Sequence, residues 1–184
     1  MYAGPSLQHR PTIQSENVVL RRPQVFDTRE IVDILNDWQV AKCLSHVPYP
    51  YTLVDAHFFL DHIVPNEWVW AINESGSPKL IGSVSLMPRN GSDVAELGYW
   101  LSRDYWGRGL ITEAARLVVD YGFKSLQLAC ITSGCFKDNV ASARVLEKLG
   151  FVANGRSKRP GPARSGDLPG IDMVLHPPDV QAMR

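Results

Sequence analysis

The stretch YWGRGLITEA, residues 105–114, joins an apolar strand to a helix and places two glycines at the mouth of that helix. Glycine is a poor helix former, so its repeated use at this junction needs a physical reason. A helix N-terminus leaves its first amide N–H groups without partners, and the helix dipole adds partial positive charge there. Because glycine has no Cβ, Gly107 and Gly109 would let the main chain approach an anion closely. We interpret them as a cradle for phosphate oxygens.

The short GRG motif does not by itself identify a phosphate site. It matches neither GxGxxG nor GxxxxGK[ST], and no Walker lysine follows it. A tight strand-to-helix turn that binds no ligand is therefore an alternative interpretation of the two glycines.

Hydrophobic periodicity and turn residues predict the order strand, two helices, three strands, helix, strand, helix and two strands. The connection after 94–102 runs through a helix, so this strand and the one at 127–133 are expected to be parallel neighbours. We predict an α/β (α+β) fold with a mixed, mostly antiparallel twisted sheet of about seven strands, flanked by about four helices. The strands are expected at 17–23, 67–73, 80–88, 94–102, within 126–136, in 151–157 and in 170–176, and the helices from Asp27, Thr52, 109 and 138.

The length of 184 residues fits one domain with a sizeable core. We expect flexible tails at 1–15 and 177–184 around a single domain at 16–176. Lys plus Arg and Asp plus Glu number 19 each, so the net charge does not favour nucleic acid or an anionic membrane. The segment GRSKRPGPARSG (155–166) is locally basic. It is expected to be a solvated loop or, alternatively, a contact for an acidic partner.

The cysteine and histidine patterns indicate neither a disulfide framework nor a metal site. The three cysteines contain no CxxC pair, and the five histidines show no metal-ligand spacing. The N-terminus lacks the apolar core of a secretory signal, and no apolar run approaches the roughly 20 residues that span a bilayer. We therefore expect a protein without a metal and with a cytoplasmic location.

A second motif changes the interpretation of the glycines. The stretch GYWLSRDYWGRGLITEA (98–114) is followed about thirty residues later by DNVASARVLEKLGF (138–151). The pair resembles the GNAT superfamily of acyl-CoA-dependent N-acetyltransferases, and the nearest subgroup is that of the ribosomal-protein N-terminal (RimJ/RimL-like) acetyltransferases. The resemblance extends from about residue 17 to residue 175. It implies the GNAT fold, with acetyl-CoA as co-substrate.

The resemblance also assigns the cofactor residues. The main chain around the glycines would hold the pyrophosphate of acetyl-CoA, the Leu101 main chain would meet the pantetheine arm, and Thr112 would add a hydroxyl. Asn139 would hold the cofactor arm, although capping of its own helix is an alternative interpretation. The implied cofactor-binding set is Leu101, Trp106, Gly107, Arg108, Gly109, Leu110, Thr112 and Asn139.

Two residues are candidates for catalysis. Strict alternation in VAELGYWL (94–101) places Glu96 on the same face as Trp100, and a carboxylate in so apolar a strand is our candidate base. An ordinary ion-paired or solvated glutamate is the alternative. Many members of the superfamily use a tyrosine on the helix of the second motif as the acid, but the matching residue here is Leu146. This leaves Ser142 or water to protonate the leaving thiolate.

The reaction implied is direct attack of an amine on the thioester, with the oxyanion bound by main-chain N–H groups at 97–101. We expect a protein or peptide N-terminal α-amine as acceptor. The alternatives are a small-molecule amine (antibiotic, amino acid or polyamine) and a non-catalytic acyl-CoA-binding protein on the same fold. No nucleic acid or membrane partner is expected, and the protein would be a monomer or a homodimer. The candidates for acceptor binding, with core packing as the alternative for each, are Trp38, His46, Tyr49, Tyr51 and Trp100, and further Trp68 and Trp70.

Overall fold

Eight strands form one sheet within residues 10–89 and 92–178, which the computed structural model describes. β5 and β6 form the parallel pair, and the other neighbouring strands in the described chain are antiparallel. The predicted mixed, mostly antiparallel sheet is therefore confirmed. Across the sheet the strands are β1 (Ile13–Gln14), β2 (Val18–Arg21), β3 (Trp68–Glu74), β4 (Leu80–Pro88), β5 (Val94–Leu101), β6 (Cys130–Phe136), β8 (Gly166–Leu175) and β7 (Val152–Gly161).

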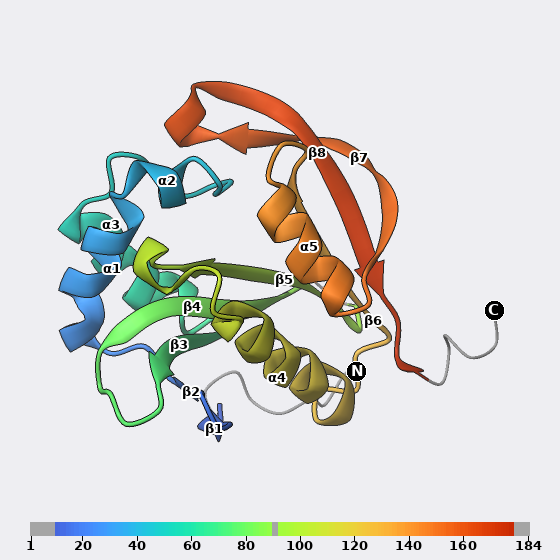
Figure 1. Ribbon diagram of the computed structural model, residues 1–184, viewed down its shortest axis with the longest axis horizontal. Coiled ribbons are helices and arrows are strands. Elements are labelled where there is room, and N and C mark those ends of the chain that lie inside the picture. The colour runs from blue at the N-terminus through green and yellow to red at the C-terminus, as the bar shows by residue number, and fades with distance from the viewer. Residues whose placement is uncertain (1–9, 90–91, 179–184) are drawn as a thin grey trace.

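Helices cover both faces of this sheet (Figure 1). Helices α4 and α5 pack on one face, and the helices of the early chain pack on the other. The helices are α1 (Thr28–Leu35), α2 (Trp38–Ala41), α3 (Leu53–Phe58) with the π-helical turn η2 (Phe59–Ile63), α4 (Leu110–Lys124) and α5 (Val140–Lys148), and three 3-10 turns are η1 (Val25–Asp27), η3 (Arg103–Tyr105) and η4 (Pro162–Arg164).

The sheet divides the core into two clusters, as the alternation in β3 illustrates. Trp68, Trp70 and Ile72 face the α4 side, whereas Val69 and Ala71 face the α1–α3 side. Successive side chains of a strand point to opposite faces, so a strand buried on both faces reads as a continuous apolar run. Such double burial is the reason that WVWAIN carries almost no polar residue.

The N-terminal tail predicted at 1–15 is too long by at least two residues. Ile13 and Gln14 form β1, where they pair with Leu20 and Val19 of β2. The polar composition of the segment gave no strand signal, because an edge strand of two residues needs only one apolar side chain to face the core. Residues 1–9 and 179–184 lie outside the described residues, so most of both predicted tails stays untested.

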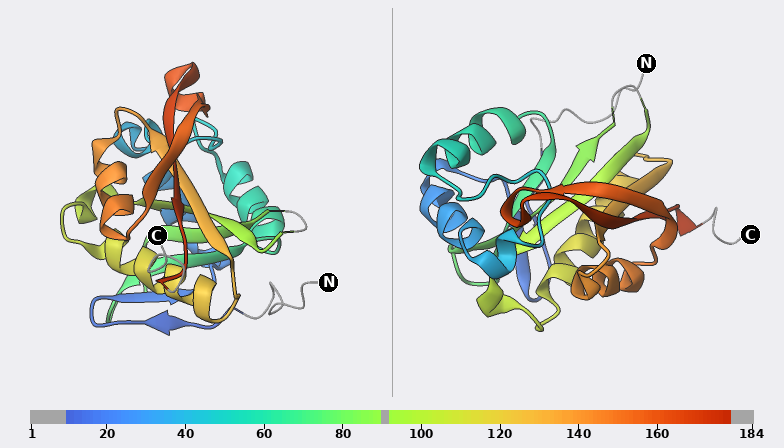
Figure 2. Two further views of the ribbon diagram at one scale, coloured as in Figure 1. Left: turned by 90° about the vertical axis from the view of Figure 1, so that its right-hand side faces the viewer. Right: turned by 90° about the horizontal axis from the view of Figure 1, so that it is seen from above.

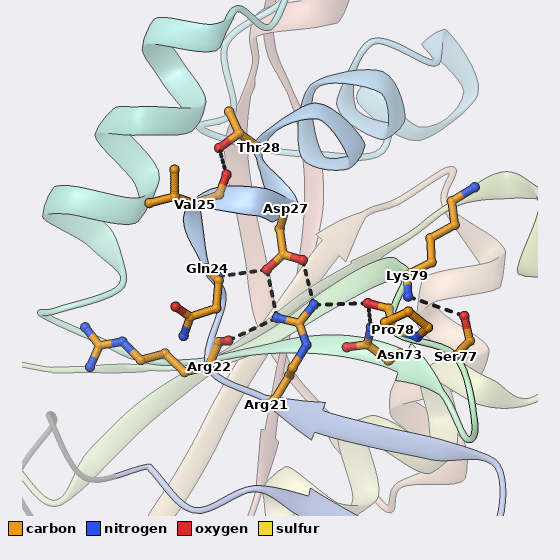
Figure 3. A network of polar contacts seen from close by, with 10 residues as sticks. All are labelled: Arg21, Arg22, Gln24, Val25, Asp27, Thr28, Asn73, Ser77, Pro78 and Lys79. Atoms are coloured by element: carbon orange, nitrogen blue, oxygen red, sulfur yellow. Dashed lines mark hydrogen bonds and ion pairs between the residues drawn. The ribbon is translucent and has the colours of Figure 1, made fainter.

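Asp27 was expected to cap the helix that follows it, but its carboxylate has another partner (Figure 3). The Arg21 guanidinium donates to both carboxylate oxygens at 2.6 and 2.8 Å. The Gln24 backbone N–H donates to Oδ2 at 2.7 Å, and Asp27 is 1% exposed. This buried pair joins the end of β2 to the start of α1.

Thr52 begins α3 with a capping box, as its sequence position predicts. Its hydroxyl accepts from Asp55 N, and the Asp55 carboxylate accepts from Thr52 N at 2.8 Å. Loss of such a cap costs about 1 kcal/mol, so we expect Thr52→Ala to lower the melting temperature by about 2–4 °C. Thermal unfolding followed by circular dichroism measures this change. Thr52→Ser keeps the acceptor and should melt with the parent; equal losses in both variants would contradict the capping role.

The feature of the fold that positions the site is the parting of β5 and β6. The two strands pair from Val94↔Cys130 to Glu96↔Thr132 and no further. β5 nevertheless stays paired with β4 as far as Leu101, and β6 stays paired with β8 as far as its last residue, Phe136. A gap therefore opens between two strands that are each held on their other side.

The hairpin of β7 and β8 extends beyond β6, and its tip lies on the side of α2 (Figure 2). The segment 155–166 belongs to this hairpin, so the prediction of a solvated loop is wrong. Arg159 lies across Gly134 and Gly170, since a Cβ built on either glycine would meet its side chain within 3 Å. Glycines on two neighbouring strands thus make room for one long basic side chain.

Candidate active site

A cavity of about 380 Å³ lies at the gap between β5 and β6. Its walls come from the end of β5, from the turn and first residues of α4, from α5 and from the end of α2. All predicted cofactor residues except Arg108 line it, and so do Ser142 and Trp100. Residues far apart in the chain are therefore brought together as the two motifs predict.

The two glycines have the backbone that the cradle interpretation requires. Gly107 and Gly109 have φ values of +76° and +80°, a region that favours glycine. A Cβ built on either would meet no protein atom within 4 Å, so the space beside them is open. Gly109 is the N-cap of α4, and no side chain caps this helix. The first N–H groups of a 15-residue helix thus face the cavity side without a side-chain partner.

Arg108, between the glycines, directs its side chain elsewhere. Its guanidinium pairs with Glu74 at the end of β3 and lies 5.4 Å from the centroid of the Tyr105 ring. The predicted contribution of Arg108 to phosphate binding is a main-chain one, and this pairing leaves it possible. The ion pair ties the glycine loop to the β3–β4 turn.

The main chain of β5 presents polar groups to the gap. Ser133 Oγ of β6 donates to Leu97 O at 2.9 Å. Trp106 Nε1 donates to Leu101 O at 2.8 Å, so this carbonyl already has one partner. The N–H and C=O of one residue point to the same side of an antiparallel strand, and the side alternates along the strand. The peptide groups of Tyr99, which lies between these two residues, therefore face the same gap.

The start of α5 is held by two side chains. Asn139 is the N-cap, and its Oδ1 accepts from Ser142 N at 3.1 Å, which confirms the capping interpretation. Tyr99 Oη lies 2.9 Å from Ser142 Oγ and donates to Ser142 O at 3.2 Å. Leu146, at the position where the superfamily often has tyrosine, is completely buried in the core.

The sequence reasoning gave no role to Tyr99, Arg144 or Lys148, although all three line the cavity. Burial raises the pKa of Tyr99 to about 12, against the opposing effect of the Ser142 hydrogen bond. Alternation places Tyr99 on the opposite face of its strand from Glu96, and the structure packs Tyr99 against the cluster that includes α4 and α5, but alternation does not name a partner. Arg144 and Lys148 are four residues apart, a spacing that puts two positive charges on one side of α5.

Glu96 lies where β5 and β6 part, outside the residues that line the cavity. The register of β4 and β5 shows no irregularity, so the predicted alternation holds and Glu96 projects to the other face of the sheet from Tyr99. One carboxylate oxygen pairs with Arg89, and the other lies 3.7 Å from Arg159 Nη1. The ion-paired alternative therefore describes its contacts.

Two cations of the β7–β8 hairpin, Arg159 and Arg164, have acidic partners within the chain. Arg159 Nη2 lies 2.7 Å from Asp172 Oδ1, and its side chain is 15% exposed. Arg164 Nη2 lies 2.6 Å from Asp138 Oδ2, and this hydrogen bond lowers the pKa of Asp138. An external acidic partner is not needed to explain these two residues.

The predicted acceptor residues separate into exposed and buried groups. Trp38 and Tyr49 are partly exposed and make an edge-on ring contact at 5.6 Å, and His46 is exposed nearby in the chain. Tyr51 belongs to the core, where its hydroxyl donates to Asp55 O at 3.2 Å. Trp68 and Trp70 are also buried in the core, which matches the packing alternative.

Two searches for other site types find nothing in the part of the chain that the structure describes. No group of three or more His, Cys, Asp or Glu side chains is arranged to hold a metal ion among residues 10–89 and 92–178. A helix both long and apolar enough to span a bilayer is likewise not found in these ranges.

Comparison with known proteins identifies relatives over most of the chain. The spermidine N(1)-acetyltransferase of Escherichia coli (strain K12) is 39% identical over 142 residues, which are 77% of this chain and 76% of that protein. The probable N-acetyltransferase YjcK of Bacillus subtilis (strain 168) is 41% identical over 95 residues. The match to YjcK covers 50% of this chain, and the chain spans about half (52%) of that protein's length.

Solved structures share the fold. An acetyltransferase (GNAT family) from Bacillus anthracis superposes with a TM-score of 0.79 at 23% identity, covering 90% of this chain and 98% of that one. The ribosomal-protein-S5-alanine acetyltransferase from Vibrio fischeri gives 0.77 at 22% identity, covering 92% and 98%. The protein-family model described as acetyltransferase (GNAT) domain matches residues 17–152 of the chain. On this match, and with the predicted cofactor residues gathered in one cavity, the chain belongs to the GNAT acetyltransferase family, in which acetyl-CoA is the acetyl donor.

Proposed function

We propose that the protein transfers the acetyl group of acetyl-CoA to a primary amine by direct attack of the amine on the thioester. The observation that carries the proposal is the single cavity in which the uncapped N-terminus of α4, the gap-facing edge of β5 and the hydroxyl of Ser142 meet. An acetyltransferase of similar fold, MccE, was solved in complex with acetyl-CoA and AMP, with a TM-score of 0.75 at 18% identity. That neighbour supports the use of this fold for acetyl-CoA.

The cavity offers a separate group for each part of the cofactor. The N–H groups at Gly107, Gly109 and the first turn of α4 would bind the pyrophosphate, with the helix dipole favouring negative charge. Arg144 and Lys148 add cationic groups at the wall formed by α5. The Tyr99 peptide N–H in the gap would bind the oxygen of the thioester, where charge develops in the tetrahedral intermediate.

Glu96 would serve the amine rather than the cofactor. Both of its carboxylate oxygens already face a guanidinium, from Arg89 and Arg159. We infer that Glu96 removes the amine proton through a bridging water. An α-amine with a pKa of about 7.7–8.0 is about one-tenth neutral at pH 7, so weak assistance suffices, whereas a lysine side chain would need more.

This electrostatic setting favours a peptide N-terminal α-amine over a polyamine as acceptor. A polyamine carries several positive charges and needs a site with an excess of carboxylates. Around Glu96 and Asp172 the guanidinium groups of Arg89 and Arg159 balance the carboxylates. The relationship to a spermidine N(1)-acetyltransferase keeps the polyamine as the second candidate.

The proposal is tested by calorimetry with acetyl-CoA, followed by an acetyl-transfer assay on a panel of amines. The panel holds short peptides with free N-termini, the same peptides with blocked N-termini and an internal lysine, free amino acids, and spermidine. We expect binding of acetyl-CoA and the highest kcat/KM with free N-termini. Preference for spermidine would select the polyamine, and binding without transfer to any amine would select the non-catalytic alternative.

A substitution at Asn139 distinguishes its role in capping α5 from a role in binding the cofactor. Asn139→Ser keeps a good N-cap, so the free energy of unfolding should stay within about 0.5 kcal/mol of the parent. The variant loses the amide N–H₂, for which the described residues offer no hydrogen-bond partner. We expect acetyl-CoA affinity to fall by about 3- to 10-fold, the value of one hydrogen bond. Unchanged affinity by calorimetry would confine Asn139 to capping.

A further inference from the structure

The leaving thiolate needs a proton, and the helix that carries this acid in many relatives has Leu146 at the relevant position. The structure brings a tyrosine to the same region from another element. Tyr99 of β5 lines the cavity, and its hydroxyl meets Ser142 of α5, which is 43 residues away in the chain.

We propose that Tyr99 and Ser142 form a hydroxyl pair that protonates the departing CoA thiolate, with Ser142 Oγ giving its proton to sulfur and Tyr99 Oη replacing it. This assignment rests on the proposed acetyl transfer. It adds a strand residue, Tyr99 of β5, as the source of the proton that Ser142 of α5 passes to sulfur.

The geometry fixes both members of the pair. Asn139 accepts from the Ser142 N–H, and the Tyr99 hydroxyl reaches both oxygens of Ser142, at 2.9 Å for Oγ and 3.2 Å for the carbonyl. The Tyr99 hydrogen can serve either oxygen, so a small rotation of the hydroxyl directs it to Oγ. Both residues line the cavity that would hold the pantetheine arm, which is where the sulfur would have to meet Oγ.

The proton and electron balance closes within the pair and solvent. The amine nitrogen forms a bond to the carbonyl carbon, the C–S bond breaks, and its electron pair leaves on sulfur. Sulfur takes the Ser142 Oγ proton, and Oγ takes the Tyr99 Oη proton. The proton lost by the amine passes through the bridging water to Glu96, which releases it to solvent, and solvent water returns a proton to the phenolate as CoA leaves.

A phenol suits this place better than serine alone. An aliphatic hydroxyl is a much weaker acid than a phenol, so an isolated Ser142 would be left as an unfavourable alkoxide. Burial raises the pKa of Tyr99, which keeps the phenol protonated throughout the neutral range. The donor is therefore loaded whenever the amine is neutral enough to attack.

The test compares Tyr99→Phe, Ser142→Ala and the double variant in the full-length protein. We expect each single variant to lower kcat by about 10- to 100-fold, with KM for acetyl-CoA within about 3-fold of the parent. The effects of groups that act as one unit are strongly non-additive. The kcat of the double variant should therefore be no more than about 3-fold below that of the less active single variant. Tyr121→Phe removes a hydroxyl from a partly buried tyrosine that packs against the core outside the cavity lining, and it should leave kcat unchanged.

A second readout needs no acceptor. The ultraviolet absorbance of the thiolate gives the pKa of CoA bound to each variant. Hydroxyl donors stabilise the thiolate, so this pKa should be higher in complexes of Tyr99→Phe and Ser142→Ala than in the parent complex. If the variants bound CoA with the same thiol pKa as the parent, the hydroxyl pair would be overturned while acetyl transfer stayed intact. The same conclusion would follow if the kcat losses of the two single variants multiplied in the double variant. Failure of the parent to bind CoA would overturn both.

Discussion

Gly109→Val should weaken acetyl-CoA binding by about 100-fold or more while leaving a folded protein. The valine methyl groups would enter the open space beside the N-terminus of α4, where the backbone N–H groups would meet the pyrophosphate. Loss of two hydrogen bonds to a charged group removes about 3–6 kcal/mol, which is a factor of about 10² to 10⁴ in the dissociation constant. Calorimetry with acetyl-CoA and with CoA measures the loss.

The chain contains a matched control for backbone strain. Gly76, in the β3–β4 turn, has φ of +82° and also no atom within 4 Å of a built Cβ. Gly76→Val and Gly109→Val should each lose about 1–2 kcal/mol of unfolding free energy, because an L-residue is disfavoured at positive φ. Only Gly109→Val should lose binding. If both variants bound acetyl-CoA like the parent, the tight-turn interpretation of the glycines would be correct.

The sequence predicted the elements whose side chains alternate or repeat strongly. The strand at 80–88 was located to the residue, because both of its faces are buried and turn residues bound it. The parallel pairing of β5 with β6 followed from the helix between them. Local pattern was sufficient here because the tertiary structure imposes the same burial that the pattern reports.

Local pattern failed where a specific side-chain or strand partner decides the outcome. Asp27 is an excellent N-cap residue, but Arg21 competes for its carboxylate and wins through two hydrogen bonds. β1 exists because β2 offers it an edge. The Gly- and Pro-rich segment of β7 forms a strand by pairing with β8, and its Arg159 lies across Gly170 of β8 and Gly134 of β6. Arg21 lies only six residues from Asp27, and Leu20 only seven from Ile13, but neither contact follows from hydrophobic periodicity or from a capping rule.

The candidate site shows the same division. Gly107, Gly109 and Ser142 were predicted from motifs, and the structure gathers them around one cavity. The contact of Tyr99 with Ser142 was not predicted, because alternation assigns a face to a residue but no partner on the facing helix. The guanidinium groups that hold Glu96 come from the ends of β4 and β7, and charge in a sequence carries no information on such pairing.

Asp27→Ala should lower the free energy of unfolding by about 3 kcal/mol, the largest loss that we expect from a single substitution outside the hydrophobic core. Asp27 is 1% exposed and accepts two hydrogen bonds from the Arg21 guanidinium. Breaking a buried pair costs about 3–5 kcal/mol because the remaining charge loses its counter-ion in a desolvated place. Arg21 is partly exposed and keeps hydrogen bonds to Arg22 O and Pro78 O, so this pair lies at the lower end. Urea unfolding followed by fluorescence measures the loss.

Two further variants separate the charge from the rest of the network. Asp120→Ala breaks the exposed pair with Lys124 and should cost no more than about 0.5 kcal/mol. The double variant Arg21→Met/Asp27→Leu removes both charges. Its free energy of unfolding should therefore lie within about 1 kcal/mol of the parent, and this remaining loss is the value of the lost acceptor for Gln24 N. A double variant as unstable as Asp27→Ala would show that the carboxylate acts on the backbone of η1, and that the guanidinium contributes little to the joint between β2 and α1.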